Sequence, residues 1–145
     1  MSDTVYGYRS GPRTPRRVLI DASTPSAPAV NDFMVLGTAG YYQVAAANED
    51  AQCVMMQVST DPASDGLSYG LADFSTLSIY EYPPDTGSAT QALMGKAMDV
   101  GGAQSVNIDA SSDGTGSDGC LECVGVNTDK NTIHVRLHKP LFAGA

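Results

Sequence analysis

The chain has 145 residues, which suits one domain and is long enough to bury a hydrophobic core. Sixteen acidic residues against eight lysines and arginines give a net charge of −8, which argues against a general nucleic-acid binder. The apolar runs are far shorter than the roughly 20 residues that span a bilayer, and no secretory signal is visible at the start. We therefore expect neither a nucleic-acid nor a membrane partner.

Half of the basic side chains lie in the first seventeen residues. They are Arg9, Arg13, Arg16 and Arg17. With one acid among them this segment carries +3, which leaves −11 on the remainder of the chain. Prolines, glycines and the lack of apolar periodicity predict an extended arm over residues 1–17, which Tyr6 and Tyr8 would anchor by packing on a neighbour. Residues 18–145 are then predicted to form a single β domain.

Short β-branched and aromatic runs between turn residues predict an all-β fold for this domain. The expected strands are residues 17–21, 32–36, 41–46, 53–58, 77–82, 106–109, 120–126 and 132–138. Glycine-containing or polar turns join the second to the third and the seventh to the eighth of these strands, which predicts two hairpins.

Three other segments carry specific expectations. The nearly continuous apolar run 53–58 is typical of a strand that is buried on both faces. The polar, glycine-rich segment 59–73 is predicted to be a long loop. Residues 88–98 are the one plausible helix, although Gly95 weakens a helix there and a strand is nearly as well supported.

The chain also contains a repeated pattern. Residues 37–82 and 101–137 both follow the order of turn, strand, Gly/Asp loop, cysteine-bearing strand, loop and alternating strand. Such an echo is a hypothesis of internal duplication, although all-β proteins also produce it by chance.

Catalytic chemistry has little support in the sequence. His134 and His138 stand four residues apart on the polar face of one predicted strand, where an exposed histidine is the commoner interpretation. We find no nucleophile elbow, phosphate-binding loop or dinucleotide fingerprint. The sequence therefore predicts neither an enzyme nor a cofactor.

The cysteines are the best candidates for a metal or redox site. Cys120 and Cys123 form a C-x-x-C pair, which together with Cys53 and His134 offers three thiolates and one imidazole to zinc. Positions 120 and 123 point to opposite faces of a regular strand, which opposes chelation. Buried free thiols are the preferred interpretation, and a disulfide or redox role remains an alternative.

The tyrosines offer a different kind of surface. Tyr41, Tyr42, Tyr80 and Tyr82 fall in predicted strands. Tyrosines in such positions most often form cross-strand pairs or oligomer contacts, and we take these four as oligomer-interface candidates. The alternative is an aromatic platform for a sugar.

The order of these features resembles that of tailed-bacteriophage head decoration, or cementing, proteins. A proline-containing N-terminal segment leads into Val30-Asn-Asp-Phe-Met-Val-Leu-Gly-Thr-Ala-Gly-Tyr-Tyr-Gln-Val-Ala, which is similar to an early apolar hairpin in that group. A small-residue stretch (45–52), a strand (53–58) and an acidic-glycine loop (61–66) follow, and residues 133–141 look like the terminal strand. The resemblance covers about two thirds of the chain.

The resemblance implies a structural virion protein on the outside of a capsid, assembled in the host cytoplasm. Its fold would be a compact β-barrel, β-tulip or jelly-roll-like sandwich with an extended N-terminal arm. Its partners would be the major capsid protein and further copies of itself, with a homotrimer favoured.

We expect the capsid contacts to come from the arm and from the strand that follows it. The arginines would pair with acidic shell residues, and strand addition by residues 18–21 would supply backbone hydrogen bonds to a neighbouring sheet edge. The capsid-contact candidates are therefore Tyr6, Tyr8, Arg9, Arg13, Arg16, Arg17, Val18, Leu19 and Ile20. The rival hypothesis is a carbohydrate- or surface-binding β-sandwich module of the adhesin type.

Overall fold

The computed structural model describes residues 7–20, 28–37, 40–47, 49–58, 69–108 and 120–137. Within these ranges the chain forms eleven β-strands and one short 3-10 turn, η1 (Gln91–Leu93), which confirms the all-β prediction. No helix in the described ranges is long and apolar enough to cross a membrane.

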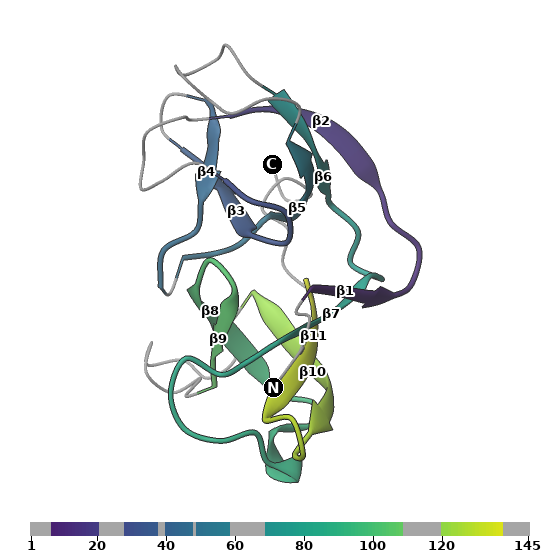
Figure 1. The fold of residues 1–145 in the computed structure, drawn as a ribbon, viewed down its shortest axis with the longest axis vertical. Coiled ribbons are helices and arrows are strands. Elements are labelled where there is room, and N and C mark those ends of the chain that lie inside the picture. The colour runs from purple at the N-terminus through teal and green to yellow at the C-terminus, as the bar shows by residue number, and fades with distance from the viewer. Residues whose placement is uncertain are drawn as a thin grey trace.

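The strands form two antiparallel sheets that lie one above the other in Figure 1. In spatial order the large sheet consists of β1 (Gly7–Ser10), β7 (Ile79–Tyr82), β11 (Thr132–Leu137), β10 (Leu121–Asn127), β8 (Ala97–Gly102) and β9 (Ser105–Asn107). The small sheet consists of β2 (Pro15–Leu19), β6 (Tyr69–Asp73), β5 (Cys53–Val58), β3 (Phe33–Leu36) and β4 (Tyr42–Val44). Neither sheet closes into a barrel, so the arrangement is sandwich-like.

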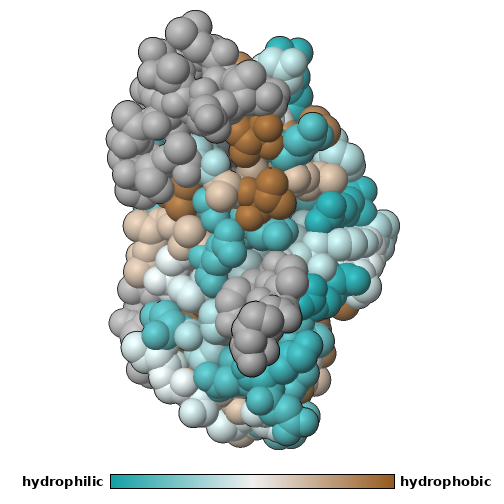
Figure 2. All heavy atoms as spheres, viewed as in Figure 1, coloured by the Kyte–Doolittle hydropathy of each residue, from teal (hydrophilic) through white to brown (hydrophobic). Residues whose placement is uncertain are grey.

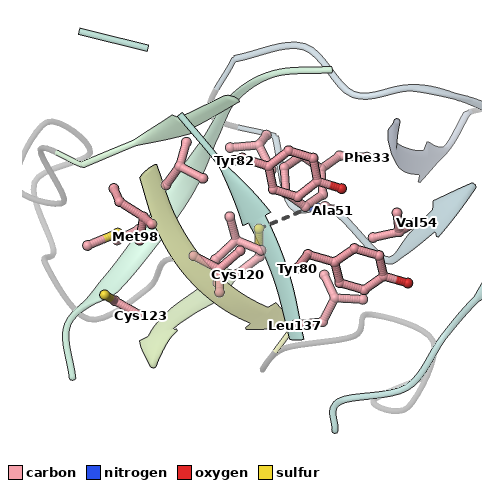
Figure 3. Close-up of a cluster of buried hydrophobic side chains, with 14 of the residues drawn as sticks. Phe33, Ala51, Val54, Tyr80, Tyr82, Met98, Cys120, Cys123 and Leu137 are labelled. Carbon is pink, nitrogen blue, oxygen red and sulfur yellow. Dashed lines mark hydrogen bonds between the residues drawn. The ribbon is translucent and has the colours of Figure 1, made fainter. Parts of the chain in front are cut away.

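The main hydrophobic core lies where the two sheets meet (Figure 3). Phe33 of the small sheet packs on Tyr82 of the large sheet with ring centroids 4.5 Å apart, and Tyr82 stacks beside Tyr80. On β11, Ile133 and Val135 are buried while His134 is half-buried, which confirms the alternation expected of this strand.

A second, smaller core fills the other face of the small sheet. Its buried members are Val18, Ile20, Met34, Val44, Cys53, Met55 and Ala72. An isolated β-bridge pairs Ile20, directly after β2, with Tyr42 of β4. Because β2 and β4 are the two outermost strands, this contact curves the small sheet around the cluster. Because one face serves this core and part of the other face serves the main core, β5 is buried on both faces at Cys53–Met55. Beyond a bulge at Met56, Gln57 is exposed.

Two predicted elements are wrong. Tyr69–Asp73, which we expected to be part of a loop, is β6 and lies second in the small sheet. The expected helix over 88–98 is only the turn η1, followed by β8. Gly95 adopts φ +80°, and Lys96 and Gly95 exchange backbone hydrogen bonds with Cys123, so pairing with β10 outweighs local helix propensity.

The predicted N-terminal arm is extended, but it does not project from the domain. β1 pairs with β7 in the large sheet and β2 pairs with β6 in the small sheet, so residues 7–17 are built into both. The expected boundary between residues 17 and 18 falls inside β2. Residues 1–6, which include Tyr6, lie outside the described residues.

The repeated sequence pattern does not correspond to a repeated topology. The cysteine-bearing strand and the alternating strand of the second stretch, β10 and β11, are neighbours. Their counterparts in the first stretch, β5 and β7, lie in different sheets. The duplication hypothesis is therefore not supported by the strand order.

We predict that Phe33→Ala destabilises the fold by about 3–5 kcal/mol, because it removes the ring that joins the two sheets and leaves a cavity. Urea denaturation followed by circular dichroism measures this change. Leu77→Ala, at a side chain that is 57% exposed, is the control and should stay within about 0.5 kcal/mol of the wild type. Equal effects of the two substitutions would contradict the assignment of Phe33 to the shared core.

Candidate interaction surface

Glu81 is a buried carboxylate on the large sheet that gathers side chains from three strands. It lies on β7 and is 2% exposed. Arg9 Nε of β1 donates a 2.6 Å hydrogen bond to it, Thr132 of β11 donates a second, and His134 Nε2 lies 3.5 Å away. A bulge in β1 between Tyr8 and Ser10 gives Arg9 no direct partner residue on β7, and bulges commonly re-aim side chains in this way.

The electrostatics of Glu81 follow from these contacts. Burial raises the pKa of a carboxyl group, but the hydrogen bonds from Thr132 and Arg9 and the charges of Arg9 and His134 outweigh it. The pKa of Glu81 is therefore lowered, and the carboxylate stays charged. Arg9 acts as its counter-ion within the chain.

Asp73 is a second buried carboxylate, at the junction of the two sheets. Its Oδ2 accepts a 2.6 Å hydrogen bond from the Tyr80 hydroxyl, and its Oδ1 accepts hydrogen bonds from the backbone N–H groups of Thr14 and Ser75. Arg13 Nε lies 3.9 Å from Oδ2, too far for a hydrogen bond, so Arg13 contributes charge alone. The guanidinium carbon of Arg13 sits 3.6 Å above the Tyr8 ring centroid.

These networks correct part of the predicted capsid contact. The guanidinium groups of Arg9 and Arg13 pair with acids of their own chain, although each side chain remains about 30% exposed. The ring of Tyr8 packs edge-on against Tyr80, and its hydroxyl donates to the Gly11 carbonyl. These three side chains therefore hold the connection between β1 and β2 in place.

The other predicted capsid-contact residues lie on β2 or directly after it, and their side chains point to two opposite faces of the strand. Val18 and Ile20 point into the small core and are buried, so they are not contact residues. Leu19 points the other way and is 44% exposed. Arg16 and Arg17 are exposed and lie on opposite faces of the strand.

Leu19 and Arg17 belong to a surface that the sequence analysis did not find. In register, Leu19 lies opposite Tyr69 and Arg17 opposite Leu71. Tyr69 is 41% exposed and Leu71 38% exposed. The Arg17 guanidinium carbon lies 3.8 Å from the Tyr69 ring centroid. We call these four residues the β2–β6 face.

Two hollows lie on the small sheet, one over β5 and β6 and the other beside β2. One, of about 240 Å³, adjoins the β2–β6 face and is lined by Gln57, Tyr69, Gly70 and Leu71. The other, of about 210 Å³, is lined by Arg16, Arg17, Val18, Tyr42 and Phe74. Figure 2 shows apolar side chains at the surface of the same half of the molecule as the small sheet, with polar side chains around them.

The four predicted oligomer-interface tyrosines separate into two kinds. Tyr80 and Tyr82 are 2% and 0% exposed and pack inside the main core, so they form neither an interface nor a sugar platform (Figure 3). Tyr41 and Tyr42 are half-buried, and Tyr42 packs edge-on against Phe74. Both rings lie on the face of β7 that the small sheet covers.

The weak metal candidates are not brought together. Cys53 lies in the small core, whereas Cys120 and Cys123 lie in the main core, and His134 contacts Glu81. Within the described ranges no group of three or more His, Cys, Asp and Glu side chains is placed to hold a metal ion. All three thiols are buried and free, and Cys120 accepts a 3.3 Å hydrogen bond from the Ala51 N–H (Figure 3). His138 lies outside the described residues.

The sequence did contain a signal for the missed surface. The run Tyr69-Gly-Leu-Ala-Asp alternates exposed and buried residues, as a half-buried strand does. The polar, glycine-rich residues before it led us to assign the whole stretch to a loop. The hydrogen-bonding role of Asp73 had no local signal, because Tyr80 and Thr14 reach it only in the folded chain.

Comparisons with protein-family models, with curated proteins and with solved structures return no match for this chain.

We predict that Glu81→Gln lowers the free energy of unfolding by about 1–3 kcal/mol at neutral pH, because it weakens buried charge-assisted hydrogen bonds. The folded-state pKa of Glu81 lies below its ordinary value of 4.5, so the carboxylate stabilises the fold above that pH. This contribution disappears as the pH falls through the folded-state pKa. Urea denaturation between about pH 7 and pH 3 should show the difference from wild type shrinking.

Glu122→Gln is the matched control for that experiment. Its carboxylate pairs with Arg136 at a more exposed position, where an ion pair contributes about 0–1 kcal/mol. A difference between Glu81→Gln and wild type that stays constant across the pH range would contradict the lowered pKa.

We also predict that the three thiols of the native protein resist a water-soluble disulfide reagent near pH 8. Burial raises the pKa of all three thiols, that of Cys120 to about 12, so little reactive thiolate forms. In denaturant all three should react rapidly. A thiol that reacts at the same rate in both states would show that it is not buried.

Proposed function

We propose that this chain is a structural virion protein that binds the outside of a phage capsid and stabilises the shell. The observation that carries the proposal is the β2–β6 face, an exposed apolar and cationic surface on the edge of the small sheet. In the docking mechanism that we propose, this face replaces the extended N-terminal arm as the surface that contacts the capsid.

The strand β2 suits docking by strand addition. It is the outermost strand of the small sheet, and edge strands are the elements to which extended partner segments add. Backbone hydrogen bonds supply affinity in this mode, and pockets for alternate side chains supply specificity. The hollow lined by Arg16, Arg17 and Val18 of β2 is placed for such a side chain.

The size of the hollows favours a protein partner over a free ligand. Small-molecule sites usually enclose about 300–1,000 Å³. The hollows measure about 240 and 210 Å³ and are shallow, so each matches a side chain better than a cofactor or metabolite. At these two hollows, a side chain of a protein partner is therefore the better-fitting occupant.

Charge supports an acidic site on the shell. The chain carries −8 overall, yet Arg16 and Arg17 place two cations on the docking edge. An exposed ion pair contributes only about 0–1 kcal/mol, so these charges orient the encounter more than they hold it. Strength then comes from buried apolar area and from many copies acting together.

Oligomerisation is part of the proposal. A homotrimer over a three-fold position of the shell would present three β2 edges to three capsid subunits at once. Its multivalency would convert weak single contacts into stable attachment. The half-buried Tyr41 and Tyr42 stay candidates for contacts between copies.

A carbohydrate-binding module is the second candidate. Tyr69 is exposed beside a hollow that Gln57 also lines, and ligand sites commonly combine an aromatic ring with a few polar groups. The Arg17 guanidinium already covers the Tyr69 ring, which leaves less room for a stacked sugar. Binding on a glycan array that is lost in Tyr69→Ala would favour this candidate over the capsid.

We predict that the particles contain about one copy of this protein per major shell subunit, which corresponds to one trimer at each three-fold position. Quantitative mass spectrometry of purified particles of the virus that encodes the chain measures this ratio. Complete absence from the particles would overturn the proposal, and a few copies per particle would point to a fibre or tail component instead.

We further predict that Leu71→Glu weakens co-sedimentation with particles by at least tenfold, because it places a charge in the apolar contact. Leu77→Glu is the matched control. It introduces the same charge at a more exposed leucine outside the β2–β6 face and should bind like wild type.

A further inference from the structure

Residues 7–20 provide the outermost strand of each sheet, and we call them the edge segment. β1 stands last in the large sheet beside β7, and β2 stands last in the small sheet beside β6. Figure 1 shows the segment, in purple, passing from one sheet to the other. Because each of its strands ends a sheet, the segment can leave without separating any two other described strands from each other.

The rest of the chain holds two buried sockets for the cations of the edge segment. Glu81 accepts a 2.6 Å hydrogen bond from Arg9, and Asp73 lies 3.9 Å from Arg13 Nε. Both carboxylates are buried. A copy without an edge segment would keep two buried carboxylates that lack a counter-ion, which is strongly unfavourable. Each copy therefore requires an edge segment, whichever chain supplies it.

The crossing point between the sheets is also shaped for this segment. Gly11 has φ +95°, and a Cβ at that position would lie 2.2 Å from the Leu77 carbonyl oxygen. Ser78 Oγ donates a 3.0 Å hydrogen bond to the Pro12 carbonyl, and the Tyr8 ring packs edge-on against Tyr80. An identical segment from a second copy can make all of these contacts.

The described surface offers little else to hold copies together. Outside the β2–β6 face, the exposed large apolar side chains lie before β3, at the end of β3, before β7 and after η1 (Val30, Leu36, Leu77 and Met94). A stable interface usually buries about 1,200–2,000 Å² with a packed apolar centre. The edge segment already has complementary contacts of this kind, namely two strand ladders, two buried ion pairs, and Val18 and Ile20 in the small core.

We propose that copies of this chain exchange their edge segments, so that the sockets of each copy hold the segment of its neighbour. The assignment rests on the oligomer of the proposed function. Residues 21–27 join the edge segment to the rest of the chain, and seven extended residues span about 25 Å at most, which reaches an adjacent copy. Head-to-tail exchange of this kind closes into a ring such as a trimer.

Exchange makes the proposed docking surface a shared one. In the β2–β6 face, Arg17 and Leu19 then come from the neighbour, whereas Tyr69 and Leu71 come from the copy that receives the segment. The contact of the Arg17 guanidinium with the Tyr69 ring becomes a contact between copies. The partner copy thus contributes half of the site, and capsid binding is coupled to assembly.

A disulfide placed across the β1–β7 ladder tests the exchange. Ser10 and Ile79 lie directly opposite each other there, at a separation that suits a disulfide. The oxidised double variant Ser10→Cys/Ile79→Cys should run as covalent multimers on a denaturing, non-reducing gel, because each bond joins two copies. Single chains that carry an internal disulfide would overturn the exchange.

The double variant Glu122→Cys/Arg136→Cys is the matched control. These positions also lie opposite each other, but β10 and β11 form a hairpin within one chain. Its disulfide should stay within single chains. Multimers in equal yield from this control would show that they arise from collisions, and the exchange would lose its support.

Particle binding by mixed oligomers provides a second readout. Leu19→Glu damages the docking face through the edge segment, and Leu71→Glu damages it through the receiving copy. When the two variants are co-expressed, an intact segment of one lies on an intact β6 of the other, so co-sedimentation should exceed that of either variant alone at least tenfold. Co-expressed variants that bind no better than either alone would contradict a shared face.

The two readouts separate this inference from the proposed function. If the Ser10→Cys/Ile79→Cys variant forms only internal disulfides while the wild type binds particles, the capsid role stands and the exchange is wrong. If the variant forms covalent multimers while the wild type does not bind particles, the exchange stands and the capsid role is wrong.

Discussion

The buried carboxylate of Asp73 is the constraint on which the arrangement of the two sheets depends. It lies at the end of β6 in the small sheet, yet its partners come from the large sheet and from the connection between β1 and β2. An unpaired carboxylate at this depth would cost several kcal/mol, so each partner must stay in place. Tyr80 thereby fixes the large sheet, and Thr14 fixes the point at which the chain crosses from one sheet to the other.

A second set of contacts ties the sheets together from the opposite side. Gln104, in the turn between β8 and β9, donates a 2.8 Å hydrogen bond to the buried Asp32, and the Phe33 N–H donates to the Ala103 carbonyl. Burial raises the pKa of Asp32 despite the hydrogen bonds from Gln104 and Ala29. Because the folded-state pKa of Asp32 is raised, its burial costs less free energy of folding once the pH falls and the group is protonated. The contribution of Glu81 to stability changes in the opposite direction. The two carboxyl groups therefore contribute to the acid response with opposite signs.

The four N-terminal arginines lie in two different environments. Arg9 and Arg13 neutralise Glu81 and Asp73, and removal of either arginine would leave a buried carboxylate without its counter-ion. Arg16 and Arg17 instead flank the outermost strand of the small sheet, where aromatic rings and exposed leucines surround them. This division places the proposed docking surface on a rigid sheet edge, so little ordering entropy is lost when a partner binds.

The sequence by itself determined the strand content and the hairpins of β3 with β4 and β10 with β11, because period-two alternation and turn residues are local properties. It did not predict β6 or the pairing of residues 7–17 into both sheets, and it left residues 88–98 open between a helix and a strand. Those segments become strands because neighbours distant in sequence satisfy their backbone hydrogen bonds. The candidate site followed the same rule. Arg16, Arg17 and Leu19 were among the predicted contact residues and are exposed. Only the tertiary structure decided that Tyr69 and Leu71 lie beside Leu19 and Arg17 and that Tyr80 and Tyr82 are covered. Burial depends on which sheet packs over a residue, and that is a property of the whole chain.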